Sequence, residues 1–192
     1  EDANRKKSLA GNEGTKIHEA IEKILIGENP KVEDEFKPSI KAFMDFLKEN
    51  ELIVEKDFIE KRLLSKNFRY TGTFDFIGYV NGKFSVVDIK TSSGIYRDYG
   101  LQTSAYLYAL NEYGGIFDSD GHFIKKIPKE IESRFILLIR RKRICHKCGA
   151  EYIVRSGREP KIENGDFNCE HDFSEIIGEF ELKEFENQNG DF

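Results

Sequence analysis

The sequence predicts an α/β fold in which helices flank a mixed central sheet. The hydrophobic period changes along the chain from about 3.6 residues to about two and then back, which indicates helices, strands and a further helix. A strand follows that last helix, and a strand, helix, strand order is typical of parallel pairing through a crossover. The length of 192 residues, of which 39% are hydrophobic, fits one domain with a buried core.

Two helices are predicted before the first strand. Over residues 14–26 apolar side chains recur every three or four positions, and Gly27 follows as a helix stop. The second helix spans residues 38–50, and Phe43 and Leu47 belong to its apolar stripe. We therefore expect two amphipathic helices that pack on the sheet.

Three strands are predicted next. Residues 58–64, 73–80 and 84–89 are rich in aromatic and β-branched side chains. Asn81-Gly82, between the last two runs, is a strong signal for a two-residue hairpin. The second and third strands are therefore expected to pair antiparallel.

One more helix and one more strand complete the expected core. Helical spacing returns over residues 101–113 and ends at Gly114. Residues 134–139 form a nearly continuous apolar run, which is typical of a buried strand. Residues 176–182 fit either a last strand or a helix, because their apolar positions match both periods.

Composition divides the chain into three segments. Residues 1–143 carry the elements just described, apart from the last, and form the predicted core. Residues 144–172 contain every cysteine and are punctuated by Gly and Pro, which indicates an insertion. Residues 173–192 are acidic and either complete the core or leave it.

The charge is negative overall but unevenly distributed. The chain has 30 Lys and Arg against 35 Asp and Glu, a net charge of −5, which argues against a protein that coats nucleic acid by bulk attraction. Residues 125–143 nevertheless hold eight Lys or Arg against two Glu. Within them, Arg140, Arg141 and Arg143 are either a solvated strand end or contacts to phosphate groups.

Two further features bear on the protein's surroundings. No apolar run approaches the roughly 20 residues that a membrane-spanning helix needs, so no membrane partner is expected. The three cysteines are odd in number and lie in one stretch, which favours a metal clip over disulfides. That pattern predicts a reducing, cytoplasmic location.

Two acids and one lysine lie on the predicted hairpin. Because side chains alternate along a strand, Asp88 and Lys90 share a face, and Asp75 points away from the face of Phe74 and Phe76. The tight hairpin brings the three charged groups together. Carboxylate oxygens suit Mg²⁺ or Mn²⁺, and a lysine beside such an ion is typical of a hydrolytic site.

Four short motifs surround these residues in a fixed order. They are G-T-x-x-H at residues 14–18, G-x-x-D at 72–75, D-x-K-T at 88–91 and Q-x-x-x-Y at 102–106. Over about residues 14–108 the chain resembles the RecB-type branch of the PD-(D/E)XK nuclease superfamily. The resemblance implies a restriction-endonuclease-like core.

The resemblance also implies a metal site. In the family, a histidine, two acids and the main-chain carbonyl after the second acid bind the ion, and these correspond to His18, Asp75, Asp88 and Ile89. Because an imidazole ligand suits Mn²⁺ better than Mg²⁺, we expect activity with Mn²⁺ at least equal to that with Mg²⁺.

Further residues are assigned through the same comparison. Lys90 corresponds to the catalytic lysine, and Gln102 and Tyr106 to the residues that line the site and contact DNA or fix the lysine. Glu22, one turn after the histidine, either reaches the site or pairs with a nearby cation. Glu60 occupies a place where relatives often have an acid, although a solvated strand position fits it equally.

These assignments predict a divalent-metal-dependent deoxyribonuclease. We expect an exonuclease on single-stranded DNA or duplex ends, in DNA repair, recombination, defence or phage replication. Its partners are expected to be DNA and a helicase or another recombination or repair protein. The alternative is a non-catalytic nucleic-acid-binding module with a zinc-stabilised docking segment, because one fold supports many functions.

The insertion carries a second candidate metal site. The spacing C-x₂-C followed by C-x-H provides a Cys₃His set that suits zinc, namely Cys145, Cys148, Cys169 and His171. His146 or His122 can replace His171 in this interpretation, and reduced cysteines without a metal are the alternative. We expect the zinc segment and the adjacent arginines to border the DNA path.

An iron–sulfur cluster is less expected than zinc. Relatives in this branch that hold one use a cysteine before the histidine helix and three after the Q-x-x-x-Y helix. Here no cysteine precedes His18, and Cys148 and Cys169 are too far apart for the usual close set.

Overall fold

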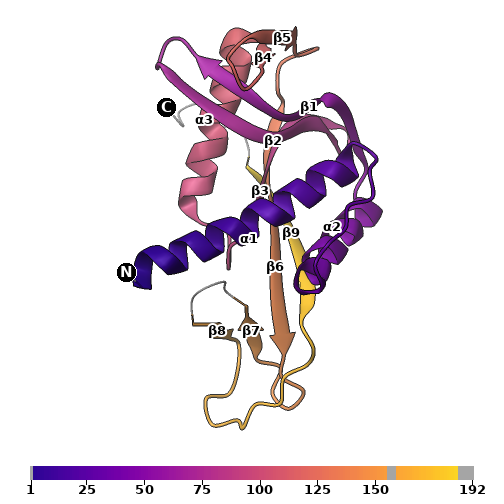
Figure 1. The fold of residues 1–192 in the computed structure, drawn as a ribbon, viewed down its shortest axis with the longest axis vertical. Helices are drawn as coiled ribbons and strands as arrows, with labels where there is room; N and C mark the ends of the chain where they lie inside the picture. The colour runs from indigo at the N-terminus through magenta and orange to yellow at the C-terminus, as the bar shows by residue number, and fades with distance from the viewer. Residues whose placement is uncertain (1, 155–158, 186–192) are drawn as a thin grey trace.

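The computed structural model describes residues 2–154 and 159–185, with the side chains of the first helix described from residue 11 onward (Figure 1). The helices of this part are α1 (Asp2–Leu25), the short 3₁₀ helix η1 (Asp34–Phe36), α2 (Lys37–Glu49) and α3 (Arg97–Tyr113). The strands are β1 (Leu52–Ser65), β2 (Tyr70–Val80), β3 (Lys83–Lys90), β4 (Gly115–Phe117), β5 (Phe123–Lys126), β6 (Ser133–Ile144), β7 (Glu151–Ile153), β8 (Lys161–Glu163) and β9 (Ile177–Phe185).

All nine described strands belong to one mixed sheet. The hydrogen-bonded order is β5-β4-β1-β2-β3-β6-β7-β8, and β9 pairs with β6 as well. Strands β3 and β6 are parallel, with α3 in the crossover between them, whereas the other pairs are antiparallel. The predicted α/β class with a mixed central sheet is therefore confirmed.

The elements predicted from periodicity are all present. The hairpin closes with Val80 opposite Lys83, and Asn81 and Gly82 have φ values of 50° and 81°, as a type I′ turn requires. Helix α3 ends at Gly114, whose φ of 67° is left-handed. The ambiguous C-terminal segment is a strand, β9, which pairs along most of β6.

Helices cover both faces of the sheet (Figure 1). On one face Ile17 and Ile21 of α1 and Phe43 of α2 pack into one hydrophobic cluster with sheet residues such as Val87. On the other face Leu110 of α3 packs into a second cluster. The three layers bury the sheet on two sides, which explains the continuous apolar run of β6.

One prediction about side-chain direction is wrong. Phe74 and Phe76 do not share a face: Phe74 packs in the cluster beneath α3, and Phe76 in the cluster beneath α1 and α2. The break coincides with one in the neighbouring strand. Glu60 lies between the pairs Ile59–Phe76 and Lys61–Phe74 and has a left-handed φ of 49°. Alternation changes in both strands at this place, because Ile59 and Phe76 pack beneath α1 and α2, whereas Leu63 and Phe74 pack beneath α3.

The cysteine-containing segment continues the same sheet. Strand β7 pairs with the end of β6, over Lys142 to Ile144, and β8 extends the sheet beyond β7. The chain then returns along β6 as β9 (Figure 1). Strands β4, β5, β7 and β8, of three or four residues each, were not predicted because they are too short to carry a period.

No helix in the described part of the chain is long and apolar enough to cross a membrane.

Helix α2 approaches β9 closely at one glycine. A Cβ atom on Gly178 would overlap the backbone oxygen of Pro38, at the start of α2. We predict that Gly178→Ala lowers the free energy of unfolding by about 1–3 kcal/mol, because α2 must move away from the sheet. Urea denaturation measures this loss. Gly94→Ala is the control, since a Cβ there meets nothing within 4 Å, and an equal loss in both variants would contradict the prediction.

Candidate functional site

The Asp75 carboxylate joins helix α1 to strand β3. Its Oδ1 lies 2.9 Å from Nδ1 of His18, and its Oδ2 accepts a hydrogen bond of 2.5 Å from the backbone N–H of Ile89. The regular pairing of β2 with β3 ends at Phe76 and Val87. Asp75 therefore lies where the two strands diverge, and it provides the acceptor that the partner strand no longer supplies.

Asp88 and Lys90 lie together on the same strand, as alternation predicts. They alternate with Val87 and Ile89, which pack beneath α1 and α2, so they face α3. Lys90 Nζ is 2.7 Å from Asp88 Oδ2, in an ion pair whose side chains are 20% and 5% exposed. This oxygen is buried and pairs with the Lys90 ammonium, and its second lone pair can still coordinate a cation.

The lysine is held by helix α3. Lys90 Nζ donates a 2.8 Å hydrogen bond to Oε1 of Gln102, whose Nε2 donates in turn to the hydroxyl of Tyr106 at 2.6 Å. The ammonium also lies 4.9 Å from the centre of the Tyr99 ring. These contacts fix the ammonium at the end of β3.

Two glycines allow the four motifs to pack against one another. A Cβ on Gly14 would lie 3.1 Å from Oγ1 of Thr91, so α1 approaches the end of β3 closely. A Cβ on Gly72 would lie 2.8 Å from the Tyr106 ring, which is 7% exposed. Gly14 of the first motif thus lies against Thr91 of the third, and Gly72 of the second against Tyr106 of the fourth. A larger residue at either glycine would crowd its neighbour.

Glu60 is closer to the centre of the site than the sequence indicated. Ligand atoms of His18, Glu60 and Asp75 all lie within 4.8 Å of one another, whereas Asp88 is not a member of this group. Glu22 lines the same small hollow as these three residues. The sequence could not show that Glu60 takes a left-handed conformation, which is costly for a non-glycine residue and is often found at functional sites.

The carboxyl groups of the site repel one another. Burial and the charge of Asp75 raise the pKa of Glu60 to about 8 and that of Asp88 to about 6. Burial opposes ionisation of Asp75 too, but His18 and the Ile89 amide lower its pKa below the usual value. For His18, Asp75 outweighs the effect of burial and raises the pKa. A bound cation would relieve this repulsion.

The donor set fits a divalent cation. Neighbouring ligands of an octahedral ion at about 2.1 Å are separated by about 3 Å, and His18 Nδ1 and Asp75 Oδ1 are 2.9 Å apart. Imidazole and carboxylate ligands suit Mn²⁺, and carboxylates alone suit Mg²⁺. His18, Glu60 and Asp75 are therefore placed to hold one ion, with Asp88 on the adjoining side of Asp75.

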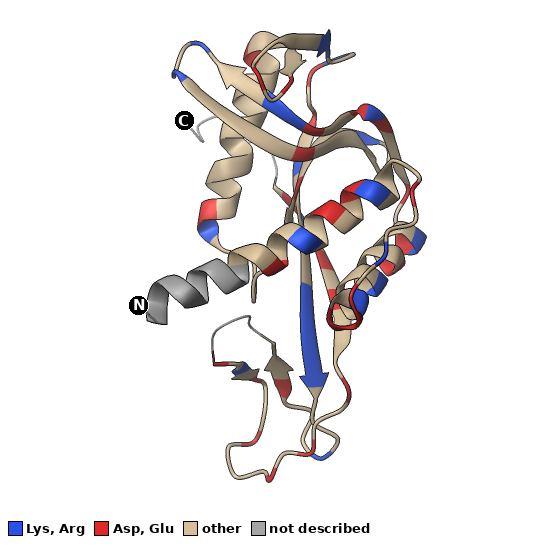
Figure 2. Ribbon diagram, viewed as in Figure 1, with Lys and Arg blue, Asp and Glu red and all other residues tan. Residues whose placement is uncertain are grey.

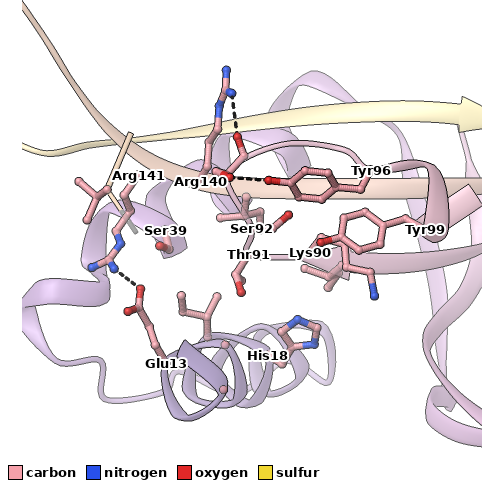
Figure 3. A pocket seen from close by; sticks show the side chains of 17 residues that line it. Glu13, His18, Ser39, Lys90, Thr91, Ser92, Tyr96, Tyr99, Arg140 and Arg141 are labelled. Carbon is pink, nitrogen blue, oxygen red and sulfur yellow. Dashed lines mark hydrogen bonds and ion pairs between the residues drawn. The ribbon is translucent and has the colours of Figure 1, made fainter. Parts of the chain in front are cut away.

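A cavity of about 500 Å³ opens beside His18 and Ile89, and Glu60, Asp75 and Asp88 are not among its lining residues (Figure 3). His18 on α1 lines one side, and Lys90, Tyr96 and Tyr99 lie across from it. Thr91, Ser92 and Ser93, in the turn after β3, also line the cavity, and so does Arg140. The lining is thus mainly polar, with two aromatic rings next to the lysine.

The arginines of β6 are largely engaged by acids. The run of basic residues occupies the second half of the strand (Figure 2). Arg140 Nε donates to Glu179 at 2.6 Å, and Arg141 pairs with Glu13 and donates to a backbone carbonyl. Arg140 and Arg141 line the cavity, whereas Arg143 is not among its lining residues, and among the described residues its buried Nε has no hydrogen-bond partner. The run is therefore neither a solvated strand end nor an open basic patch.

The Cys/His residues of the insertion converge. One ligand atom each from Cys145, Cys148, Cys169 and His171 lies within 4.8 Å of the others. Cys145 and Cys169 sulfurs are 3.9 Å apart, too far for a disulfide but close to the edge of a tetrahedron around zinc, about 3.8 Å. Neither His146 nor His122 belongs to this group. This arrangement can hold one tetrahedral metal ion.

The protein backbone prepares Cys145 for a metal. Burial opposes ionisation, but the amides of Cys148 and Asp172 and the His171 side chain lower the pKa of Cys145 to about 5. A thiolate is the form that binds metal. Burial and the neighbouring sulfurs raise the pKa of Cys169 to about 11, a repulsion that a bound cation would remove.

Comparison of the chain with models of known protein families finds no matching family, and a search of curated proteins finds no match.

A divalent cation that binds to His18, Glu60 and Asp75 should stabilise the folded protein. We predict that Mn²⁺ at about 100 times its Kd raises Tm by about 5–10 °C, since the folded state alone presents these ligands. Asp75→Asn should lose most of the shift, because a neutral amide neither attracts the ion nor accepts from His18 as strongly. Differential scanning fluorimetry measures both.

The control for this measurement is Asp118→Asn. Asp118, Asp120 and His122 form another group of possible ligands, but the last two are exposed and none contacts Asp75. An equal loss of the shift in both variants, or an undiminished shift in Asp75→Asn, would contradict the assignment.

Proposed function

We propose that the protein is a divalent-metal-dependent DNA nuclease that hydrolyses phosphodiester bonds. One observation carries the proposal: Asp75 places His18 and the end of β3 together, where Lys90 is fixed by Gln102. Phosphodiester hydrolysis needs an oriented water and stabilisation of negative charge on the phosphate. The candidate site offers a group for each need.

The ion would be held by His18, Glu60 and Asp75, which lie within 4.8 Å of one another, and we propose Asp88 and the Ile89 carbonyl as further ligands. Support comes from the 2.9 Å separation of His18 Nδ1 and Asp75 Oδ1 and from the buried carboxylate of Asp88, which pairs with Lys90. When bound, Mg²⁺ or Mn²⁺ supplies Lewis-acid activation of water and neutralises charge on the phosphate.

Lys90 is the proposed catalytic residue of the chain itself. Its ammonium would orient the attacking water and stabilise the charge that develops on the phosphate oxygens. Gln102 holds Lys90 through a hydrogen bond, and Tyr106 holds Gln102, so these two are positioning residues. Burial raises the pKa of Tyr106, which keeps its hydroxyl protonated at neutral pH.

The family proposal rests on the same contacts. Gly14 with Thr91, and Gly72 with Tyr106, bring all four motifs of the RecB-type PD-(D/E)XK branch to one place. A mixed sheet flanked by helices is compatible with a restriction-endonuclease-like core. We propose an exonuclease that acts on single strands or duplex ends, together with a helicase or another recombination or repair protein.

Cleavage should depend on Lys90. We predict that Lys90→Ala lowers the rate of Mn²⁺-dependent cleavage of labelled DNA by about 100-fold or more while Tm changes little. Asp88→Ala should be equally deficient. Lys83→Ala removes a lysine from the other end of the same strand, where it pairs with Glu184, and should cleave normally.

EDTA should stop cleavage by the wild-type protein. Full activity in Lys90→Ala would refute the catalytic assignment. DNA binding without any cleavage by the wild type would instead favour a non-catalytic binding module.

We further propose that the Cys/His group binds a structural zinc ion. The segment has few apolar residues of its own, so a metal would hold its turns in place. Val154, directly after β7, lines the large cavity together with Arg140. Zinc would therefore also keep one wall of the proposed DNA path in position.

Metal analysis tests this proposal. We expect about one zinc per chain in the purified protein, with Cys148→Ser losing most of it. His146→Ala is the matched control, because His146 lies in the same turn but outside the group of ligands. Wild-type protein without zinc, or Cys148→Ser with a full equivalent, would contradict a zinc site.

A further inference from the structure

Two tyrosines form an aromatic platform at the large cavity, next to the lysine. Tyr96 and Tyr99 both line the cavity, and their ring centres are 5.5 Å apart at an interplanar angle of 81°. Tyr99 in turn lies under the ammonium of Lys90, 4.9 Å from its ring centre. The platform is thus connected directly to the proposed catalytic residue (Figure 3).

The Tyr96 ring is exposed but held in place. Half of its surface, 50%, is open to solvent. Its hydroxyl forms a 2.7 Å hydrogen bond with Oγ of Ser93, and its ring packs edge to face with Tyr99. A tyrosine that is held by two contacts and is still half exposed loses little conformational entropy when a flat ligand packs on it.

The surroundings of the platform suit a nucleotide. Lys90 supplies positive charge on one side, and the Thr91 hydroxyl and the guanidinium of Arg140, which is paired with Glu179, also line the cavity. Proteins that bind single-stranded nucleic acid combine such charge with aromatic rings on which unpaired bases stack. The volume of about 500 Å³ lies within the range of small-ligand pockets, roughly 300–1,000 Å³.

We propose that Tyr96 stacks an unpaired base of the DNA strand whose phosphate is presented to Lys90. This inference rests on the proposed nuclease function and narrows its substrate to a strand that is unpaired at the site. Bases inside a duplex are stacked on their neighbours and offer no free face to a tyrosine. The ring therefore selects single-stranded DNA or a frayed end over intact duplex.

Binding without cleavage isolates the stacking contact. Fluorescence anisotropy in buffer without added Mn²⁺ or Mg²⁺ compares two oligonucleotides of equal length, oligothymidine and the same backbone with abasic sites. We expect the wild type to bind oligothymidine about 5- to 100-fold more tightly, the range for one stacked base. Tyr96→Ala should lose this preference, whereas Tyr96→Phe should keep it, because the ring remains.

Phe123→Ala provides the matched control. Phe123 is also 50% exposed, but it lies on β5, where its ring packs on Phe117. This variant should retain the preference for bases. A full preference in Tyr96→Ala, or its equal loss in Phe123→Ala, overturns the stacking site.

The cleavage assay separates the two proposals. A wild-type protein that cleaves DNA in Mn²⁺ yet binds both oligonucleotides equally overturns the stacking site and leaves the nuclease assignment standing. A wild-type protein that neither cleaves nor binds DNA overturns both. Retention of the base preference by the Lys90→Ala variant supports a stacking contact that acts independently of catalysis.

Discussion

The candidate active site depends on one carboxylate, that of Asp75, which lies where the pairing of two strands ends. At Asp75 the ladder between β2 and β3 has stopped, and the side chain takes over as acceptor for the Ile89 amide. The other oxygen reaches His18 on a helix that crosses the sheet. A single buried acid thus fixes the distance between α1 and the end of β3, and Lys90 follows Ile89 directly. A change in that contact would move His18 relative to the end of β3.

Two candidate metal sites with different chemistry are built into one sheet. The site at the end of β3 offers an imidazole and carboxylates, which suit hard or borderline ions such as Mg²⁺ and Mn²⁺. The site beyond β6 offers three sulfurs and an imidazole, which suit zinc. In both, crowded anionic groups have raised pKa values, namely Glu60 and Asp88 in the first and Cys169 in the second. This difference in ligand hardness would let each site select its own ion.

Local patterns in the sequence were enough to predict the contacts within one strand or one helix. Alternation placed Asp88 beside Lys90, and helical spacing placed Gln102 beside Tyr106. The pairing of His18 with Asp75 was predicted only through the order of the motifs, because 57 residues separate them. Periodicity alone carries no information about contacts over such distances.

Other features of the site depend on tertiary contacts that no local pattern reveals. Glu60 has a left-handed backbone in β1, beside the place where the alternation of Phe74 and Phe76 in β2 breaks. Arg141 pairs with Glu13, 128 residues away, so a basic run that looked open in the sequence is neutralised in the fold. The cysteine spacing, by contrast, predicted its cluster well because two of its ligands lie in one tight turn.

The central claim is that His18 and Asp75 bind one divalent ion beside Lys90. Anomalous diffraction from crystals soaked in Mn²⁺ tests it most directly, because it locates the ion without reference to activity. The account predicts one strong peak within about 2.5 Å of both His18 Nδ1 and Asp75 Oδ1. A map with no peak between these two atoms at saturating Mn²⁺ would contradict it.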